Sequence, residues 1–133
     1  MNQPENIQKA LRNDKVIDIT TIGRKSGKPR RIEIWFHHWQ GNLYLTGLPG
    51  PRSWAANLYA HPQFVFHLKE SVQLDIPATA VPIRVTQERR EILSALLAEM
   101  KLPPERSDVD QWVAGSPLFR LVLDESAIDR SND

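Results

Sequence analysis

The chain has 133 residues, of which 41% are hydrophobic and 25% charged, and its formal charge at pH 7 is +1. This length suits one globular domain, so we predict a single domain over residues 1–133. The sequence contains no cysteine, which excludes disulfides, Cys-ligated metals and a catalytic thiolate. The balanced charge makes nucleic acid an unlikely principal ligand.

The sequence offers no sign of export or of a membrane span. Its apolar runs are far too short to cross a bilayer, and residues 1–5 lack the basic and then hydrophobic start of a secretory signal. We therefore expect a cytoplasmic protein.

The first half of the chain predicts a helix or arm followed by an antiparallel meander. Residues 1–15 carry Ile7, Ala10 and Leu11 at helical spacing, and β-branched residues dominate the segment that follows. Turns rich in glycine separate the next alternating segments. The predicted strands cover residues 16–22, 31–39 and 43–47.

The second half predicts further short strands with helices between them. Ser53 is the predicted N-cap of a helix that Pro62 ends, and the long alternating stretch 72–85 is predicted to bend at Pro77 and Pro82. The remaining predicted elements are strands 63–69 and 118–123, helices 87–101 and 108–114, and a frayed tail at 126–133.

Together these elements predict a mainly β (α+β) fold. Six short, mostly consecutive strands with helical insertions favour a small antiparallel β-barrel with two to four peripheral helices. The strand–helix alternation of a doubly wound parallel sheet is absent from the pattern.

The segment after the first predicted strand concentrates positive charge. Arg24, Lys25, Lys28, Arg30 and Arg31 fall within eight residues. With the Ser26 hydroxyl and the N–H groups of a turn, these cations suit phosphates or carboxylates. A nucleic-acid patch and a solvated hairpin tip are the alternatives. A P-loop is excluded, because Gly23 and Gly27 enclose three residues where four are needed and Pro29 follows Lys28.

A second candidate site is the loop of residues 47–53 that leads into a helix. A helix start offers free N–H donors, and Gly47 and Gly50 allow a flat ligand to approach the backbone. The alternative is a plain connector whose Trp54 and Leu58 fill the core.

The sequence gives little support to other chemistry. The four histidines lack ligand spacing, since His37 and His38 are neighbours on a strand and point to opposite faces. No nucleophile elbow is present, and Glu88, Glu91 and Glu99 lie on the polar side of a helix. We expect no metal site and no dedicated catalytic residue.

Three segments resemble the deazaflavin-dependent nitroreductase family in order and spacing. They are Ile19–Arg30, with its Gly-Arg-Lys-Ser-Gly core, Gly41–Leu45, and Ser53–Pro62, which contains Trp-x-x-Asn-Leu. The resemblance covers about residues 16–70. It implies a split β-barrel like that of the FMN-binding pyridoxamine phosphate oxidases, and an oxidoreductase that binds coenzyme F420, a deazaflavin with a phosphate and an oligoglutamate tail.

The resemblance also implies roles for particular residues. The hairpin residues would hold the phosphate or the tail, and residues Gly47 to Trp54, together with Asn57, would line the ring. Hydride transfer is the chemistry of the cofactor, so the protein needs only to position the reactants. The implied cofactor-binding residues are Arg24, Lys25, Ser26, Lys28, Arg30, Arg31, Gly47, Leu48, Arg52, Ser53, Trp54 and Asn57.

Several alternatives stay open. An electron-poor quinone, nitro compound or enone is the implied substrate class, although family members that reduce nitroimidazoles use C-terminal tyrosines and this chain has only Tyr44 and Tyr59. FMN is the alternative cofactor, and a noncatalytic binder of nucleic acid or an acidic partner through residues 23–31 is the third hypothesis. The resemblance further implies a homodimer, for which Trp35, His37 and Trp39 offer a surface.

Overall fold

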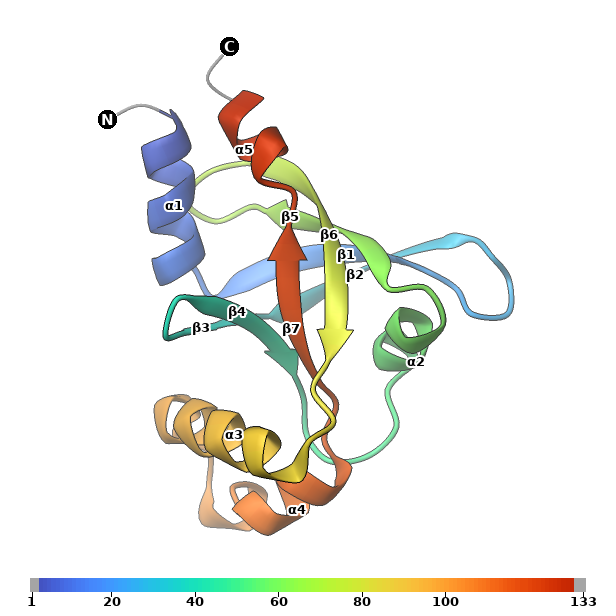
Figure 1. The fold of residues 1–133 in the computed structure, drawn as a ribbon, viewed down its shortest axis with the longest axis vertical. Helices are drawn as coiled ribbons and strands as arrows, with labels where there is room; N and C mark the ends of the chain where they lie inside the picture. The colour runs from blue at the N-terminus through green and yellow to red at the C-terminus, as the bar shows by residue number, and fades with distance from the viewer. Residues whose placement is uncertain (1–2, 131–133) are drawn as a thin grey trace.

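The computed structural model of the chain describes residues 3–130, and its strands form one antiparallel sheet. The strand order is β2-β1-β5-β6-β7-β4-β3, and the sheet curls into a barrel (Figure 1). This confirms the predicted mainly β fold. The strands are β1 (Val16–Ile22), β2 (Pro29–Trp35), β3 (His37–Trp39), β4 (Asn42–Thr46), β5 (Gln63–Leu68), β6 (Leu74–Pro82) and β7 (Leu118–Leu123).

The described chain has seven strands where six were predicted, because the strand expected over residues 31–39 is broken at Phe36. β2 pairs with β1, whereas β3 pairs with β4 at the other end of the strand order. Phe36 is buried, its N–H donates to the Lys15 carbonyl at 3.0 Å, and its ring meets that of Phe66 edge-on. The alternating pattern continues through this bend, so the sequence alone did not reveal it.

Pro77, where a bend or bulge was predicted, does not interrupt the pairing of β6, and β6 ends at Pro82. Pairing with β5 continues through Pro77, which lies opposite Val65. The Pro77 carbonyl accepts from the Asp124 N–H at 2.8 Å, just beyond the residues that pair with β7. Because the N and C=O of a strand residue point the same way, the missing N–H of Pro77 costs no bond to β5.

Helices cover both ends of the barrel (Figure 1). α1 and α5 lie beside each other at one end, α3 and α4 lie at the other, and α2 lies near the projecting β1–β2 hairpin. α5 is a correction, because residues 126–130 were predicted to fray and instead bury Ala127 and Ile128. The bounds are α1 (Gln3–Asn13), α2 (Ser53–Ala60), α3 (Thr86–Met100), α4 (Val109–Gly115) and α5 (Glu125–Arg130), with a 3₁₀ turn η1 (Pro104–Arg106).

Two apolar clusters hold these layers together. The larger fills the barrel around Ile17, Leu45 and Phe66, and α1 closes it with Ile7. The smaller lies between α3, α4 and the outer face of β4 and β7, around Leu93 and Trp112. Trp35, His37 and Trp39 were expected to form one surface. In the structure Trp39 packs against this second cluster, whereas Trp35 is exposed.

None of the helices among residues 3–130 is long and apolar enough to cross a membrane. The cytoplasmic location stays a prediction.

The burial of His37 makes the stability of the fold sensitive to acid. Burial, followed by the nearby charge of Lys15, lowers the pKa of His37 from 6.5 to about 4. In the unfolded chain this histidine takes up a proton near pH 6.5, whereas in the folded chain it resists doing so. Its contribution to stability is therefore present above pH 6.5 and is lost as the pH falls toward 4.

We predict that His37→Gln flattens the fall in unfolding free energy between pH 6.5 and 4, by up to roughly 3 kcal/mol. Urea unfolding at a series of pH values measures this slope. His61→Gln, at an exposed histidine, is the matched control and should leave the slope unchanged. Equal slopes in wild type and His37→Gln would show that His37 titrates normally in the folded protein.

Candidate functional site

The basic hairpin between β1 and β2 is a tight turn. The Gly23 N–H donates to the Lys28 carbonyl at 2.8 Å, and the Gly27 N–H donates to the Gly23 carbonyl at 2.9 Å. Gly27 has a φ of +69°, which favours glycine. A Cβ on Gly23 would lie 2.5 Å from Ser26 Oγ, so a side chain at this position would force the Ser26 hydroxyl to move. The exposed cations of this turn are thus carried by a fixed backbone.

Asn57 of α2 ties the hairpin to the barrel. Its Oδ1 accepts from the Arg24 N–H at 3.0 Å, and its Nδ2 donates to Thr21 Oγ1 at 3.1 Å. Asn57 and Thr21 are both buried. The resemblance implied that Asn57 lines a ring, which stays a prediction; in the structure its amide orients the first residue of the basic turn.

The N-terminus of α2 lies against the hairpin, and the residue predicted to cap it does not do so. The N-cap position is Arg52, no side chain bonds to the first turn, and Ser53 is the first helical residue. The N–H groups that begin every helix are therefore not used by a side chain here. Arg52 instead donates to the carbonyls of Leu48 (3.1 Å) and Pro51 (3.4 Å).

A cleft of about 500 Å³ opens between the hairpin and α2, and we call it the hairpin cleft. The described residues that line it include no carboxylate, so the charge of its wall is positive. Seven of the twelve residues predicted to bind a cofactor line it. The lining is Thr21, Gly23, Arg24, Lys25, Ser26, Arg30, Ile32, Ser53, Trp54 and Asn57.

A second cleft, of about 870 Å³, adjoins the first and lies between α2, the start of α3 and the end of α4. We call it the arginine cleft. Arg24 and Ser53 line both clefts, so the two clefts share part of their walls. The sequence indicated only one side of this cleft, the loop of residues 47–53, and not the walls at Arg84, Arg89 and residues 114–117. Its lining is Arg24, Gly50, Pro51, Arg52, Ser53, Ala55, Ala56, Tyr59, Ile83, Arg84, Arg89, Ala114, Gly115, Ser116 and Pro117.

Arg89 holds one wall of the arginine cleft in place. Its guanidinium donates to the carbonyls of Ile83 (2.9 Å), Trp112 (3.3 Å), Val113 (3.0 Å) and Ser116 (2.6 Å). Burial lowers the pKa of Arg89 from its ordinary value. Because the pKa of arginine is very high, the guanidinium still stays charged. A cation at the end of α4 also suits the dipole of that helix.

The structure does not bring all the predicted residues to the clefts. Arg31 lies on β2 and pairs with Asp18 at 3.0 Å, away from the tip of the hairpin. Lys28 is exposed and lines neither cleft, and its N–H donates to Ser26 Oγ at 3.2 Å. Gly47 and Leu48 also line neither cleft, but a Cβ on Gly47 would contact Arg52 and Trp54.

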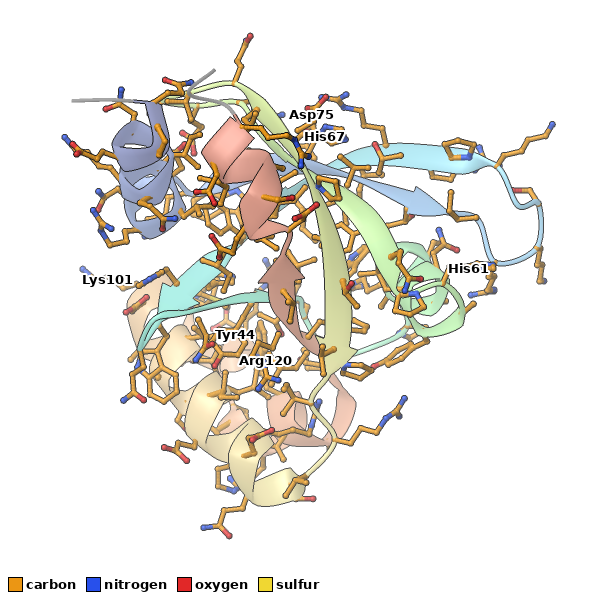
Figure 2. All side chains as sticks on the ribbon, turned by 45° about the horizontal axis from the view of Figure 1, so that its top comes forward. Tyr44, His61, His67, Asp75, Lys101 and Arg120 are labelled. Carbon is orange, nitrogen blue, oxygen red and sulfur yellow. The ribbon has the colours of Figure 1, made fainter. Side chains whose placement is uncertain are left out.

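A row of three polar side chains crosses the sheet elsewhere. Thr20 Oγ1 lies 2.7 Å from His67 Nε2, and His67 Nδ1 lies 2.7 Å from Asp75 Oδ1. Figure 2 shows His67 and Asp75 side by side on neighbouring strands, far from Tyr44 and Arg120 on β4 and β7. The row resembles a hydrolase triad in its bonding, but none of its members lines either cleft, and it satisfies a buried histidine.

The described residues contain no group of three or more histidine, cysteine, aspartate or glutamate side chains that could hold a metal ion.

The Asn57 link leads to a test of the hairpin. We predict that Asn57→Ala lowers the unfolding free energy by about 1–3 kcal/mol, because it leaves the buried Thr21 hydroxyl and the Arg24 N–H without their partner. Chemical denaturation measures the change. Asn13→Ala, at an exposed asparagine, is the control and should stay within about 0.5 kcal/mol of wild type. Equal effects of the two variants would mean that the bridge does not stabilise the fold.

Comparisons with known proteins agree with this geometry. A sequence model of the F420H(2)-dependent quinone reductase family matches residues 2–110. A comparison with curated proteins found no match.

Solved structures share the fold at low sequence identity. An F420 reductase is 14% identical, with a TM-score of 0.65 over 88% of this chain and 92% of that one. A Listeria innocua protein described as a pyridoxamine 5′-phosphate oxidase is 14% identical, with a TM-score of 0.66 over 91% and 93%. A protein described as a domain-swapped dimer is 23% identical, with a TM-score of 0.60 over 90% and 94%.

These findings confirm the predicted split β-barrel and the resemblance on which the expected cofactor rested. The family model covers well over half of the chain, including the basic hairpin and α2. The protein therefore belongs to the F420H(2)-dependent quinone reductase family, and it is an oxidoreductase that uses coenzyme F420.

Proposed function

We propose that this protein transfers a hydride from reduced F420 to an electron-poor organic acceptor such as a quinone, a nitro compound or an enone. The observation that supports this most directly is the adjoining pair of clefts, one beside the basic hairpin and one beyond it. Their combined size leaves room for a cofactor and a second reactant. A quinone that accepts the hydride and a proton becomes the hydroquinone.

The hairpin cleft fits the acidic part of the cofactor. Arg24, Lys25, Ser26 and Arg30 line it, and it contains no carboxylate among its described lining residues. Cations and backbone N–H groups are the donors that phosphates and carboxylates take in proteins. We propose that these four residues hold the phosphate or the tail of F420, and that Lys28 and Arg31 contribute only to the surrounding field.

The junction of the two clefts fits the ring. Ser53 begins α2 there, and Trp54 lines the hairpin cleft with its ring 6.0 Å from that of Phe119, measured between centroids. Free N–H groups at the start of α2 favour an electron-rich ring edge. When bound, reduced F420 supplies the hydride, while the protein positions the two reactants and limits the access of water.

The test is a fluorescence titration of cofactor-free protein with F420 and, in parallel, with FMN. We predict that Arg24→Ala/Lys25→Ala weakens F420 binding by at least about tenfold, since two charge-assisted contacts are lost. Lys9→Ala/Arg130→Ala removes the same charge at the other end of the barrel and should leave affinity unchanged. Equal affinity in all three proteins would overturn the assignment of the hairpin.

The parallel arms separate the alternatives. Preference for FMN would contradict the proposed hydride transfer from F420, but it would be consistent with the split-barrel fold. If neither compound binds, salt-sensitive binding of generic DNA or RNA would favour a noncatalytic role for the hairpin.

We also propose a homodimer formed through the outer face of β1, β2 and β5. Trp35 projects from this face with 58% of its surface exposed, which is unusual for tryptophan. Beside it lie charges of both signs, Asp18, Glu33, Arg31 and Lys69, so two copies related by a twofold axis would meet with complementary charge.

Sedimentation at micromolar concentration tests this proposal. We predict a dimer whose dissociation constant rises at least about tenfold in Trp35→Ser, because a large aromatic contact is lost. Val85→Ser removes an exposed apolar side chain elsewhere and should not change it. A monomeric wild-type protein would contradict the proposal.

A further inference from the structure

The arginine cleft has positive charge for which the proposed hydride transfer gives no use. Arg84 and Arg89 line it together with Arg52, and its described lining includes no aspartate or glutamate. The four carbonyls bonded to Arg89 and the two bonded to Arg52 are neutral acceptors. No ion pair joins Arg52, Arg84 or Arg89 to a carboxylate within residues 3–130, so their charges lack a counter-ion.

Arg84 is the cation of this wall best placed to receive a ligand. It is exposed, and its guanidinium carbon lies 5.4 Å from the centre of the Tyr59 ring. The Tyr59 ring in turn packs on Phe119, with 4.9 Å between ring centroids. This aromatic support holds the guanidinium at the cleft without neutralising its charge.

The cleft also has an apolar part. Ala55, Ile83 and Pro117 line it, and Ser116 lies beside them. Ser116 is buried, and its hydroxyl has no hydrogen-bond partner in the described structure. Buried hydroxyl groups are normally satisfied, so this one is a donor that a polar ligand atom could engage after rotation about the Cα–Cβ bond.

We propose that the arginine cleft selects an electron acceptor that is an organic anion, with a carboxylate or sulfonate attached to an apolar body. The acidic group would lie against Arg84, with Arg52 and Arg89 adding to the field, and the apolar body would fill the space toward Ser53 and the hairpin cleft. This substrate class rests on the proposed function, because the adjoining hairpin cleft would hold the cofactor.

Two acceptors that differ in charge test the proposal. Naphthoquinone sulfonate and uncharged naphthoquinone are compared by steady-state kinetics with saturating reduced F420. In each reaction the quinone gains a hydride and a proton and becomes the hydroquinone, while reduced F420 is oxidised. Binding of the sulfonate to cofactor-free protein is measured separately by calorimetry.

We expect Arg84→Gln to lower kcat/KM for the sulfonate about tenfold, through KM, and to weaken its binding equally. The variant should leave kcat/KM for the uncharged quinone and the affinity for F420 unchanged. Added salt should reduce the sulfonate preference of the wild type. Arg106→Gln makes the same charge change at an exposed residue outside both clefts and should have no effect.

Other outcomes overturn the inference. Equal losses for both quinones, or no loss for either, would mean that Arg84 does not recognise the charge of the acceptor. Weaker F420 binding in Arg84→Gln would assign the cleft to the tail of the cofactor. If F420 fails to bind the wild type while sulfonate binding still depends on Arg84, the proposed function fails and the anion preference stands.

Discussion

The buried amide of Asn57 is the contact on which the site depends. This side chain accepts a hydrogen bond from the Arg24 N–H and donates one to Thr21 Oγ1. It therefore attaches the base of the exposed β1–β2 hairpin to the short helix α2. Without that link the two clefts would not share a common wall. The amide is suited to this because it carries an acceptor and a donor on two separate atoms, whereas an ionised carboxylate can only accept.

The chain is nearly neutral overall, yet its clefts are positive, because acidic side chains are bound to partners elsewhere in the fold. Asp18 is held by Lys69 and Arg31, and these bonds keep the pKa of Asp18 below its usual range. Glu70 accepts from the N–H groups of Lys15 and Val16, and Asp108 caps α4. These carboxylates are used to secure strand and helix ends, which leaves the arginines around α2 without neutralising partners.

The hairpin and α2 could be predicted from the sequence because their signals are local. Gly23, Gly27 and the clustered cations lie in one short segment, and Trp54 and Asn57 lie in another. The family resemblance was also carried by these segments. Arg31 shows the limit of the method, since its charge belongs to the same cluster but its place on β2 turns it toward Asp18.

The arginine cleft could be predicted only in part, at the loop of residues 47–53, because the rest is made by segments that are distant in the sequence. Residues 50–59, 83–89 and 114–117 carry no shared motif, and only the fold brings them together. The break at Phe36 was hidden for another reason, since a bend that preserves alternation leaves the pattern unchanged. α5 is short and polar, and what orders it is the burial of Ala127 and Ile128.

The arrangement of the first and last helices has a practical consequence. α1 and α5 contact each other at the end of the barrel opposite α3 and α4, and away from the hairpin (Figure 1). A carrier or a solid support attached through either helix would therefore hold every molecule in one orientation, with the hollow around α2 facing the solution.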